Sequence, residues 1–442
     1  ARCFSHFSSL CLPYESPLGN PRPTPGYADT ETFTQYDPVG VCGAIVPFNF
    51  PLLIASWKVA PAIAFGNALI LKPSEYTPLT AMALQCLFDE AVEAVETSKG
   101  ATNVSRKLFQ VVPGGREIGE AIAANSNIDL VAFTGSTFVG RQVQAAVAVP
   151  EDQWAPLRRC TLELGGNAPA IVCADANIEE TAEQLFHGIF MNAGQNCCAV
   201  GRVLVHEEVD MALAQALHEK MEQQLKVGDP FDKTTTLGPV VSKGHALRLK
   251  RLLHDTQQDG IALQLSCPDT VSYTVPGLDL EEDSVTVPVF EADDFETEET
   301  AEQGMGTEDG WRQPRGPEFD TCFVKPSVSL NVGDDSYLGS TEAFGPLARF
   351  MRPFIDVDEA AERANSTHFG LAGGVFTADM DLAADLAAKL DCGNVWVNTW
   401  NWAPVMAPFA GRKASGFGSN LGVEEARATW TNPKQVTLPR RS

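Results

Sequence analysis

Short apolar runs alternate with longer amphipathic segments over residues 39–150 of the chain. The runs predict strands, because each spans four to six residues and stops at a proline, a glycine or a polar residue. The longer segments predict helices, because their apolar positions recur every three or four residues. The predicted strands are 41–46, 68–71, 108–112 and 129–133, and the predicted helices are 52–64, 80–95 and 118–124. Such alternation is typical of a parallel sheet covered by helices on both faces.

A second α/β series follows the paired glycines Gly165 and Gly166. Its predicted strands are 169–172 and 202–206, and its predicted helices are 181–192 and 209–225. Order is expected to resume at 321–326, and the pattern alternates again through 395–398. Two further strands are predicted at the ends of the chain, over 30–36 and 434–438. The last one stands alone in the pattern and therefore requires a partner elsewhere, such as a second subunit.

The length of 442 residues exceeds what one hydrophobic core usually organises, so two or three domains are expected. Breaks in the pattern place boundaries near residues 38 and 165. The stretch 265–317 shows no sustained periodicity, and a structureless loop this long is uncommon inside a compact domain. We therefore interpret it as an insertion in the second domain.

The net charge of −25 argues against nucleic acid and anionic membranes as partners. Residues 279–309 contain thirteen carboxylates and neither Lys nor Arg, so this one stretch carries about half of the excess. A run of like charges is most often a solvated segment, which agrees with an insertion. No apolar run reaches the ~18 residues that a membrane-spanning helix needs.

The eleven cysteines are odd in number and scattered, which favours reduced thiols over a disulfide framework. No CxxC pair and no closely spaced histidines occur, so no metal site is predicted. The N-terminus shows no secretory signal. An intracellular location is expected, the cytoplasm first, with an organelle not excluded.

Three segments carry candidate chemistry, and each one alone has an ordinary structural explanation. Cys197 follows a glycine-containing turn, where a thiol can be an exposed nucleophile or simply a small buried side chain. Glu163 stands among apolar residues before paired glycines, as a general base or as an exposed strand residue. Gly135 and Ser136 join a strand to a helix, where amides can bind a pyrophosphate, although such turns are common.

Taken together and in order, these motifs and several others resemble the aldehyde dehydrogenase superfamily. The matching segments are 47–51, 72–75, 135–137, 163–166, 194–197, 342–346, 369–377 and 408–418. The resemblance covers nearly everything from residue 37 onward except the acidic insertion. It implies an α/β fold with a Rossmann-like NAD-binding domain (39–165), a second α/β catalytic domain (166–411) and a small oligomerisation β element. The segments 1–38 and 412–442 are expected to supply the oligomerisation strands, the latter after returning to the cofactor domain.

The resemblance implies an oxidoreductase that converts an aldehyde to a carboxylic acid through a thiohemiacetal and a thioester. Cys197 matches the nucleophile, Asn49 the oxyanion donor, and Glu163 the base that activates water. The expected cofactor is NAD, with NADP possible, because Glu75 with Lys72 matches the pair that holds the adenosine ribose. The other cofactor positions implied are Pro47, Phe48, Ser74, Gly115, Gly135, Ser136, Glu342 and Phe344.

The chain also departs from the family pattern. Phe48 replaces a commoner Trp, Ala410 a usual Gly, and Ser419-Asn420 an Arg-Glu pair of many members. Members carry further elements before the segment that corresponds to 1–38, so the resemblance implies that upstream residues are lacking. Trp400 and Trp402 occupy the region of the family's substrate-tunnel wall.

Two other functions stay open at this point. A coenzyme A-acylating enzyme is disfavoured by Glu163, because that reaction needs no hydrolytic base. A non-catalytic or truncated paralogue with a binding or structural role is disfavoured by the intact Cys197, Asn49 and Glu163. By resemblance the partners are a small-molecule aldehyde and further copies of the chain, as a homodimer or homotetramer.

Overall fold

Two compact units divide the chain in the computed structural model. The structure describes residues 1–10, 22–23, 30–99, 105–149, 156–256, 261–264, 270–273, 285–288 and 322–439. The first unit comprises Ala1–Leu164, Ala403–Gly411 and Ser415–Ser442, and the second comprises Gly165–Trp402 and Arg412–Ala414. The division after Leu164 lies one residue before the expected boundary. Near the C-terminus the observed division differs more from the expected one. Residues Ala403–Gly411 belong to the first unit, whereas they were expected in the second.

A six-stranded sheet forms the centre of the first unit, in the order β19-β7-β6-β3-β4-β5. Its strands are β3 (Val41–Ile45), β4 (Ala68–Lys72), β5 (Phe109–Val111), β6 (Leu130–Thr134), β7 (Arg159–Glu163) and the short β19 (Gly416–Phe417). All neighbours are parallel except β19, which pairs antiparallel with β7. The 3-10 turn η1 (Arg106–Leu108) leads into β5. These strands confirm the four predicted between residues 41 and 133.

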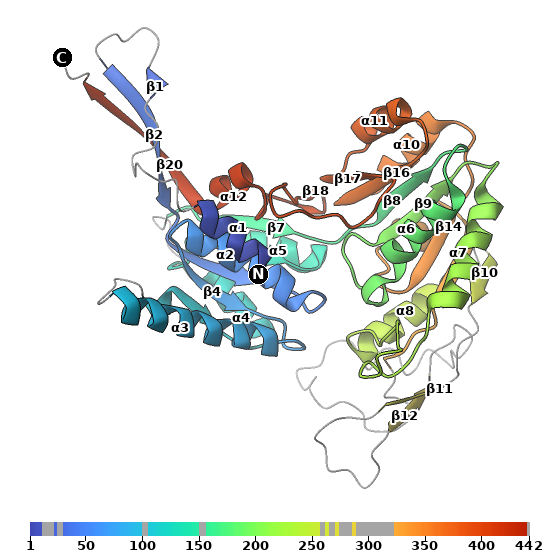
Figure 1. Ribbon diagram of the computed structural model, residues 1–442, viewed down its shortest axis with the longest axis horizontal. Coiled ribbons are helices and arrows are strands. Elements are labelled where there is room, and N and C mark those ends of the chain that lie inside the picture. The colour runs from blue at the N-terminus through green and yellow to red at the C-terminus, as the bar shows by residue number, and fades with distance from the viewer. Residues whose placement is uncertain are drawn as a thin grey trace. The chain divides into compact units, whose positions relative to one another are not determined.

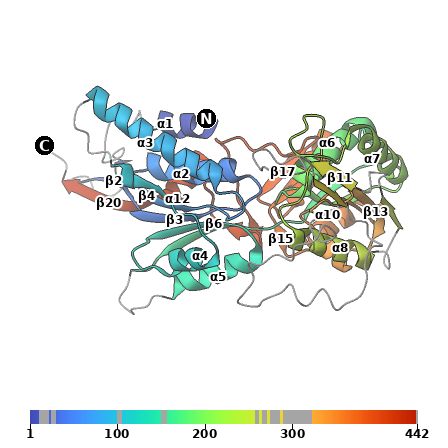
Figure 2. The same ribbon diagram turned by 90° about the horizontal axis from the view of Figure 1, so that it is seen from below.

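Helices cover both faces of this sheet, as Figure 2 shows. One face carries α2 (Pro51–Ala64) and α3 (Leu79–Lys99), and the other carries α4 (Arg116–Ala124) and α5 (Thr137–Ala148). The helix α2 begins with a proline, whose fixed φ suits a first helical position. Every residue of β6 is buried, as expected for a strand covered on both sides. The predicted α/β class with a parallel sheet is confirmed.

The helix α1 (Arg2–Leu10) packs on α2 and has no counterpart among the sequence predictions. Cys3 and Phe7 are its buried residues. The Cys3 thiol donates to the carbonyl oxygen of Ser56 at 3.3 Å, and the ring of Phe7 meets that of Phe65 edge-on. The sequence analysis did not predict a helix in this serine-rich segment, whose two buried residues lie four positions apart.

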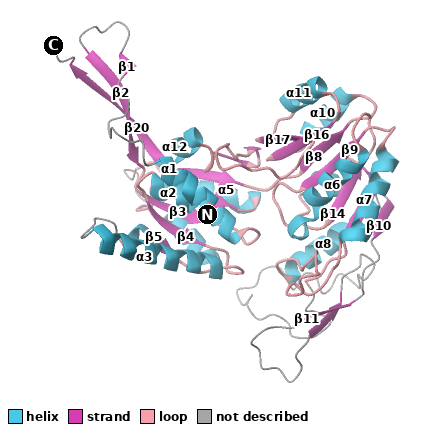
Figure 3. Ribbon diagram, in the orientation of Figure 1, coloured by secondary structure: helices cyan, strands magenta, loops and turns pink. Residues whose placement is uncertain are grey.

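A long antiparallel ribbon belongs to the first unit (Figure 3). It pairs β2 (Thr30–Pro38) with β20 (Thr431–Pro439), and β1 (Arg22–Pro23) lies on the other side of β2. The helix α12 (Val423–Trp430) leads directly into β20. The partner that the last strand was expected to need elsewhere is β2 of the same chain, which pairs with it throughout.

The second unit is built on a seven-stranded sheet in the order β10-β13-β14-β9-β8-β16-β17. The strands are β8 (Ala168–Val172), β9 (Val200–Val205), β10 (Ile261–Gln264), β13 (Ser327–Val332), β14 (Leu347–Met351), β16 (Ala372–Phe376) and β17 (Asn394–Val397). Only β10 runs antiparallel to its neighbour among these strands. Order was expected to resume at 321–326, and the next strand of this sheet, β13, begins at Ser327.

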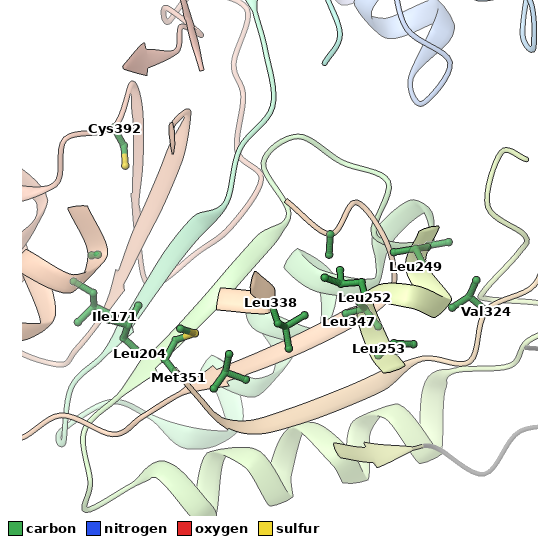
Figure 4. Close-up of a cluster of buried hydrophobic side chains, with 14 of the residues drawn as sticks. Ile171, Leu204, Leu249, Leu252, Leu253, Val324, Leu338, Leu347, Met351 and Cys392 are labelled. Atoms are coloured by element: carbon green, nitrogen blue, oxygen red, sulfur yellow. The ribbon is translucent and has the colours of Figure 1, made fainter. Parts of the chain in front are cut away.

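The remaining elements of the second unit are helices and short pieces. They are α6 (Ile178–Phe190), η2 (Met191–Gly194), α7 (Asp210–Gln224), α8 (Lys243–Thr256), α9 (Tyr337–Ser340), α10 (Val357–Asn365), α11 (Met380–Lys389), β15 (Phe369–Gly370) and β18 (Arg412–Lys413). The large apolar core of this unit joins α8 to the sheet. Figure 4 shows Leu249, Leu252 and Leu253 of α8 beside Leu347 of β14. This packing supports the loop that precedes β14, because Leu249 also lies against Gly345.

The predicted insertion lies mostly outside the described residues. Its described part holds two short strands, β11 (Thr270–Tyr273) and β12 (Val285–Pro288), which pair antiparallel with each other. Nowhere in the described parts of the chain is a helix both long and apolar enough to cross a membrane. The same parts contain no group of three or more His, Cys, Asp or Glu residues that could hold a metal ion.

Candidate active site

Four candidate residues of the first unit lie at the carboxyl edge of its parallel sheet. Asn49 follows β3, Lys72 ends β4, Ser136 follows β6, and Glu163 ends β7. The strands β4, β3, β6 and β7 are adjacent and parallel, so these ends share one edge of the sheet. In open α/β sheets this edge is where ligands usually bind. The positions thus agree with a shared site on this unit.

The carboxylate of Glu163 is buried and surrounded by donors. Its Oε1 accepts from the Asn420 side-chain amide at 2.8 Å, and its Oε2 accepts from the Thr134 hydroxyl at 3.0 Å. The ammonium of Lys58, which is completely buried, lies 3.8 Å from the same Oε2. Burial lowers the pKa of Lys58, and the adjacent Glu163 opposes that shift. The two hydrogen bonds and the adjacent ammonium fix the position of this carboxylate at the end of β7.

Lys72 and Glu75 form a pair beyond β4. The Lys72 ammonium is buried, donates to the carbonyl oxygen of Pro73 at 3.0 Å and lies 3.8 Å from the Glu75 carboxylate. Burial lowers the pKa of Lys72, while Glu75 acts in the opposite direction. Glu75 itself is half-exposed, so its carboxylate can accept a hydrogen bond from a bound hydroxyl. Nearby, the Ser74 hydroxyl accepts from the Tyr76 amide at 3.3 Å.

The other cofactor candidates of the first unit stand at loops and helix starts. The Ser136 hydroxyl caps α5 by accepting from the Val139 amide, and Gly115 stands at the N-cap of α4. Gly135 has no room for a side chain, because an added Cβ would lie 2.5 Å from the ring of Phe133. Both helices point their N-terminal amides at this edge of the sheet, as an anion site requires. Phe48 packs edge-on against the Tyr76 ring, and Pro47 is the second residue after β3.

Cys197 lies in the second unit on a loop with an unusual backbone. Asn192, Ala193 and Gly194 are consecutive residues in the left-handed region, with φ of 57°, 55° and 69°. Gly194 also touches Gly345 so closely that an added Cβ would lie 2.0 Å from the Gly345 carbonyl oxygen. Non-glycine residues with positive φ persist only where their surroundings impose it. This loop is therefore held in one shape just before Cys197.

The Cys197 side chain is partly exposed, and its immediate neighbours are fixed. Its sulfur lies 3.8 Å from that of the buried Cys198, and an added Cβ at Gly166 would lie 2.4 Å from the Cys197 carbonyl oxygen. Gln195 links the loop to Val241, whose amide donates to the Gln195 side chain at 2.8 Å. The segments 165–166 and 194–197, distant in sequence, thus meet within this unit.

Glu342 and Phe344 lie in the loop before β14, beside the same segment. The Glu342 carboxylate accepts from the Gly166 amide at 2.9 Å, and desolvation raises the pKa of this carboxyl to about 7, against the effects of Gly166 and Arg248. The Phe344 carbonyl oxygen lies 2.7 Å from Nε2 of His245. Burial lowers the pKa of His245 to about 4, so the ring is neutral and donates this hydrogen bond. Both candidates are therefore held close to the Cys197 loop.

Two residues after β17 contact the residues on either side of Cys197. The indole Nε1 of Trp400 donates to the carbonyl oxygen of Cys198 at 2.9 Å. The side-chain Nδ2 of Asn196 donates to Asn401 Oδ1 at 3.1 Å. Trp400 is 6% exposed, whereas Trp402 is 72% exposed. Of the two tryptophans, Trp402 is thus the one available to contact a substrate, and Trp400 supports the Cys197 loop.

The substitution Trp400→Phe should lower stability more than Trp396→Phe. Trp400→Phe leaves the buried Cys198 carbonyl oxygen without its donor, which costs about 1–3 kcal/mol in the free energy of unfolding. Trp396 donates its indole N–H to the carbonyl oxygen of the exposed Trp402, where water can replace the lost donor. Urea denaturation of both variants checks this. If both variants lose the same free energy of unfolding, the hydrogen bond to the Cys198 carbonyl oxygen contributes no more to stability than the one made by Trp396.

Several functional neighbours escaped the sequence analysis. Lys58 and Thr134 contact Glu163, and Trp400 and Asn401 contact the Cys197 loop, but none was a candidate for these contacts. One signal was present: Lys58 is a single charge in the otherwise apolar 52–64 helix, and a buried charge needs a partner. The pairings themselves join residues far apart in the sequence.

Comparison with known proteins gives a consistent result. The model of the aldehyde dehydrogenase family matches residues 13–276 and 277–436. The chain is 37% identical over 407 residues to mouse retinaldehyde dehydrogenase 3, which covers 92% of this chain and 67% of that protein. It is 33% identical over 442 residues to mouse mitochondrial 10-formyltetrahydrofolate dehydrogenase, covering 98% of this chain and 40% of that protein.

Solved structures agree with the sequence relatives. A mutant aldehyde dehydrogenase from Bacillus cereus superposes with a TM-score of 0.78 and 32% identity, covering 99% of this chain and 75% of that one. A mutant betaine aldehyde dehydrogenase from Staphylococcus aureus, in complex with NAD+, has a TM-score of 0.78 and 29% identity, covering 99% and 76%. The expected fold and the nicotinamide cofactor of the family are thereby confirmed. The chain belongs to the aldehyde dehydrogenase family and is an oxidoreductase that converts aldehydes to carboxylic acids with a nicotinamide cofactor.

Proposed function

We propose that this chain oxidises an aldehyde with NAD by a hydrolytic mechanism in which Cys197 is the nucleophile and Glu163 the base. The observation that carries the proposal is the contrast between Cys197 and the buried cysteines. Burial raises the pKa of Cys3, Cys173 and Cys392 to about 11, which keeps these thiols protonated and unreactive. Cys197 instead is partly exposed, on a loop whose backbone is fixed on both sides.

The chemistry begins when the Cys197 thiolate adds to the aldehyde carbon and forms a tetrahedral thiohemiacetal. The Asn49 side-chain amide and the Cys197 backbone N–H donate to the developing oxyanion. The nicotinamide, when bound, accepts the hydride that leaves as the oxyanion collapses to a thioester. Glu163 then takes a proton from water, which attacks the thioester and releases the acid. Each step uses a residue that the chain itself supplies.

The first unit fits a dinucleotide at the carboxyl edge of its sheet. The N-termini of α4 and α5 offer amides for a pyrophosphate, and Ser136 stands at the second of them. Lys72 with Glu75 suits a ribose diol, because a half-exposed carboxylate accepts hydroxyl hydrogen bonds and repels a 2′-phosphate. This supports NAD over NADP. In the second unit Glu342 and Phe344 would hold the nicotinamide ribose and the ring.

Replacing Glu75 with Gln should shift the preference toward NADP. Loss of the carboxylate removes the repulsion, so kcat/KM for NADP should rise about tenfold while that for NAD falls. Glu93→Gln is a matched control, because Glu93 is an exposed residue of α3 paired with Arg106. Steady-state kinetics with both cofactors measure the ratio. If the ratio of kcat/KM for NADP to kcat/KM for NAD is unchanged in Glu75→Gln, Glu75 does not determine the cofactor preference.

Hydrolysis is better supported than transfer to coenzyme A. The Glu163 carboxylate is held by two donors and a buried ammonium, an arrangement suited to a base and without use in acyl transfer to a thiol. The substrate is a small or medium aldehyde. The relatives named above act on chemically diverse aldehydes by name, so retinaldehyde and betaine aldehyde belong in the test panel.

The direct experiment measures NADH formation by the purified chain with NAD and the aldehyde panel. Turnover with release of free acid supports the proposal, and turnover that requires coenzyme A would replace it with acyl transfer. Retained NAD binding without turnover on any aldehyde would favour a binding protein. Binding is followed separately, by quenching of tryptophan fluorescence.

Assembly and location belong to the same proposal. The strand β20 pairs with β2 along one edge, which leaves its other edge as the surface for a second copy of the chain. A homodimer or homotetramer follows by family resemblance, and light scattering distinguishes the two. The scattered cysteines support a reducing intracellular compartment, which fractionation of the source cells tests.

A further inference from the structure

The buried pocket around Glu163 contains one carboxylate, one ammonium and two neutral donors. Asn420 and Thr134 each donate one hydrogen bond to the carboxylate, and Lys58 is the charged side chain that contacts it among the described residues. Lys58 and Asn420 are 0% exposed and Glu163 is 4% exposed. Lys58 and Asn420 are therefore fully buried, and Glu163 keeps a small exposed fraction.

A rigid loop fixes Asn420 in this pocket. The flanking residues Gly418 and Gly422 have φ of 79° and 80°, a backbone region that favours glycine. The Ser419 hydroxyl bonds to the Phe409 amide and to the carbonyl oxygens of Phe409 and Leu421 at 2.9–3.0 Å. This anchoring orients the next side chain toward Glu163. Ser419 and Asn420 occupy positions at which many members of the family carry Arg-Glu. In this chain Ser419 anchors the loop and Asn420 contacts Glu163.

A neutral amide at position 420 has a consequence for the charge of the pocket. A carboxylate there would place two negative groups beside the single ammonium of Lys58, and coupled carboxylates cannot both ionise easily. The amide donates to Glu163 without competing for the ammonium. Within the described residues, the Lys58 ammonium and Asn420 Oδ1 make no hydrogen bond.

We propose that Asn420 is a positioning residue for Glu163. Its amide holds the carboxylate beside Lys58, so that hydrolysis depends on the charge of one carboxylate and not on a coupled pair. This inference rests on the proposed role of Glu163 as the base in thioester hydrolysis. The inference adds that Asn420 sets the orientation and the ionisation of Glu163.

The test compares Asn420→Asp with the parent chain across the acidic side of the pH profile. Asn420→Asp adds a negative charge next to Glu163, so the acid limb of steady-state turnover should move to higher pH by about one unit. The single-turnover NADH burst should keep its amplitude, because thioester formation does not need the base. Asn125→Asp is the matched control: it makes the same change at an exposed position whose side chain contacts the Asn127 amide, and its acid limb should stay in place.

A second variant covers the case in which Asn420→Asp does not fold. Asn420→Ser removes the amide donor without adding charge, and it should lower steady-state turnover while the burst is retained. A purely structural role would instead reduce burst and turnover together. The inference is overturned if the acid limb of Asn420→Asp coincides with that of the parent, or if Asn420→Ser turns over like the parent.

The variant Glu163→Gln separates this inference from the proposed function. If Glu163→Gln hydrolyses the thioester normally, the base role fails and the inference falls with it. If Glu163→Gln cannot hydrolyse but the Asn420 variants behave like the parent, only the inference is lost. Infrared difference spectra of the parent against Glu163→Gln show directly at which pH the carboxylate takes up its proton.

Discussion

Replacing Cys197 with serine is expected to abolish aldehyde oxidation, with a loss in kcat/KM of at least about a thousandfold. The hydroxyl occupies nearly the same volume, but it is a weak nucleophile at neutral pH without an adjacent base. Because the nucleophile acts before hydride transfer, the NADH burst should disappear together with the steady-state rate. Stopped-flow absorbance of NADH measures both quantities in one experiment.

Cys198→Ser is the control for this experiment. Cys198 is buried, its sulfur lies 3.8 Å from that of Cys197, and the hydrogen bond from Trp400 involves only its backbone oxygen. Turnover should therefore stay within about threefold of the parent, a change below ~1 kcal/mol. NAD binding should persist in both variants. Full activity in Cys197→Ser with loss in Cys198→Ser would exchange the roles of the two thiols.

The edge of the first-unit sheet was predictable from the sequence because it depends on local patterns. Strand ends are marked by prolines, glycines and polar residues, and the carboxyl ends of parallel strands share one edge. Asn49, Lys72, Ser136 and Glu163 each follow or end such a strand, and the structure places all four at that edge. The family resemblance supplied Asn49 and Lys72 as candidates, and the predicted strands explain why Asn49, Lys72 and Ser136 share an edge; the strand that ends at Glu163 was not predicted.

The loop around Cys197 was beyond such reasoning. Cys197 precedes β9, so it lies at the amino end of a strand and not at the carboxyl end where ligand-binding residues usually stand. Two of the three consecutive left-handed residues are Asn192 and Ala193, and nothing in their sequence requires positive φ. The close approach of Gly345 imposes that shape, and it comes from a segment about 150 residues further along the chain.

The charged contacts of Glu163 were likewise not predictable from local sequence patterns. The sequence reveals Lys58 as a charge inside an apolar helix, but it does not say which carboxylate neutralises it. Asn420 reads as a departure from the family pattern, and its contact with Glu163 spans 257 positions. Likewise β20 looks like a strand without a partner until β2, near the other end of the chain, pairs with it. Long-range pairing decides these features, and local patterns do not encode it.

Replacing Glu163 with glutamine is expected to separate the two halves of the reaction. The amide keeps the shape of the side chain but cannot take a proton from water, so hydrolysis should slow by about 10²–10⁴-fold. Thioester formation by Cys197 needs no such base. The variant should therefore release close to one equivalent of NADH per chain in a burst, and then nearly stop.

The trapped thioester is the measurement that decides this prediction. Mass spectrometry of the stopped variant should find the acyl group on the peptide that contains Cys197, and hydroxylamine should release it. Thr134→Val is a control with the carboxylate intact, since it removes only one hydrogen bond to Glu163, and it should still turn over. A Glu163→Gln variant with neither burst nor turnover would place the carboxylate before hydride transfer, as an activator of the thiol. Steady turnover in that variant would require another base, and the buried pocket of Lys58, Thr134 and Asn420 would then have a structural purpose alone.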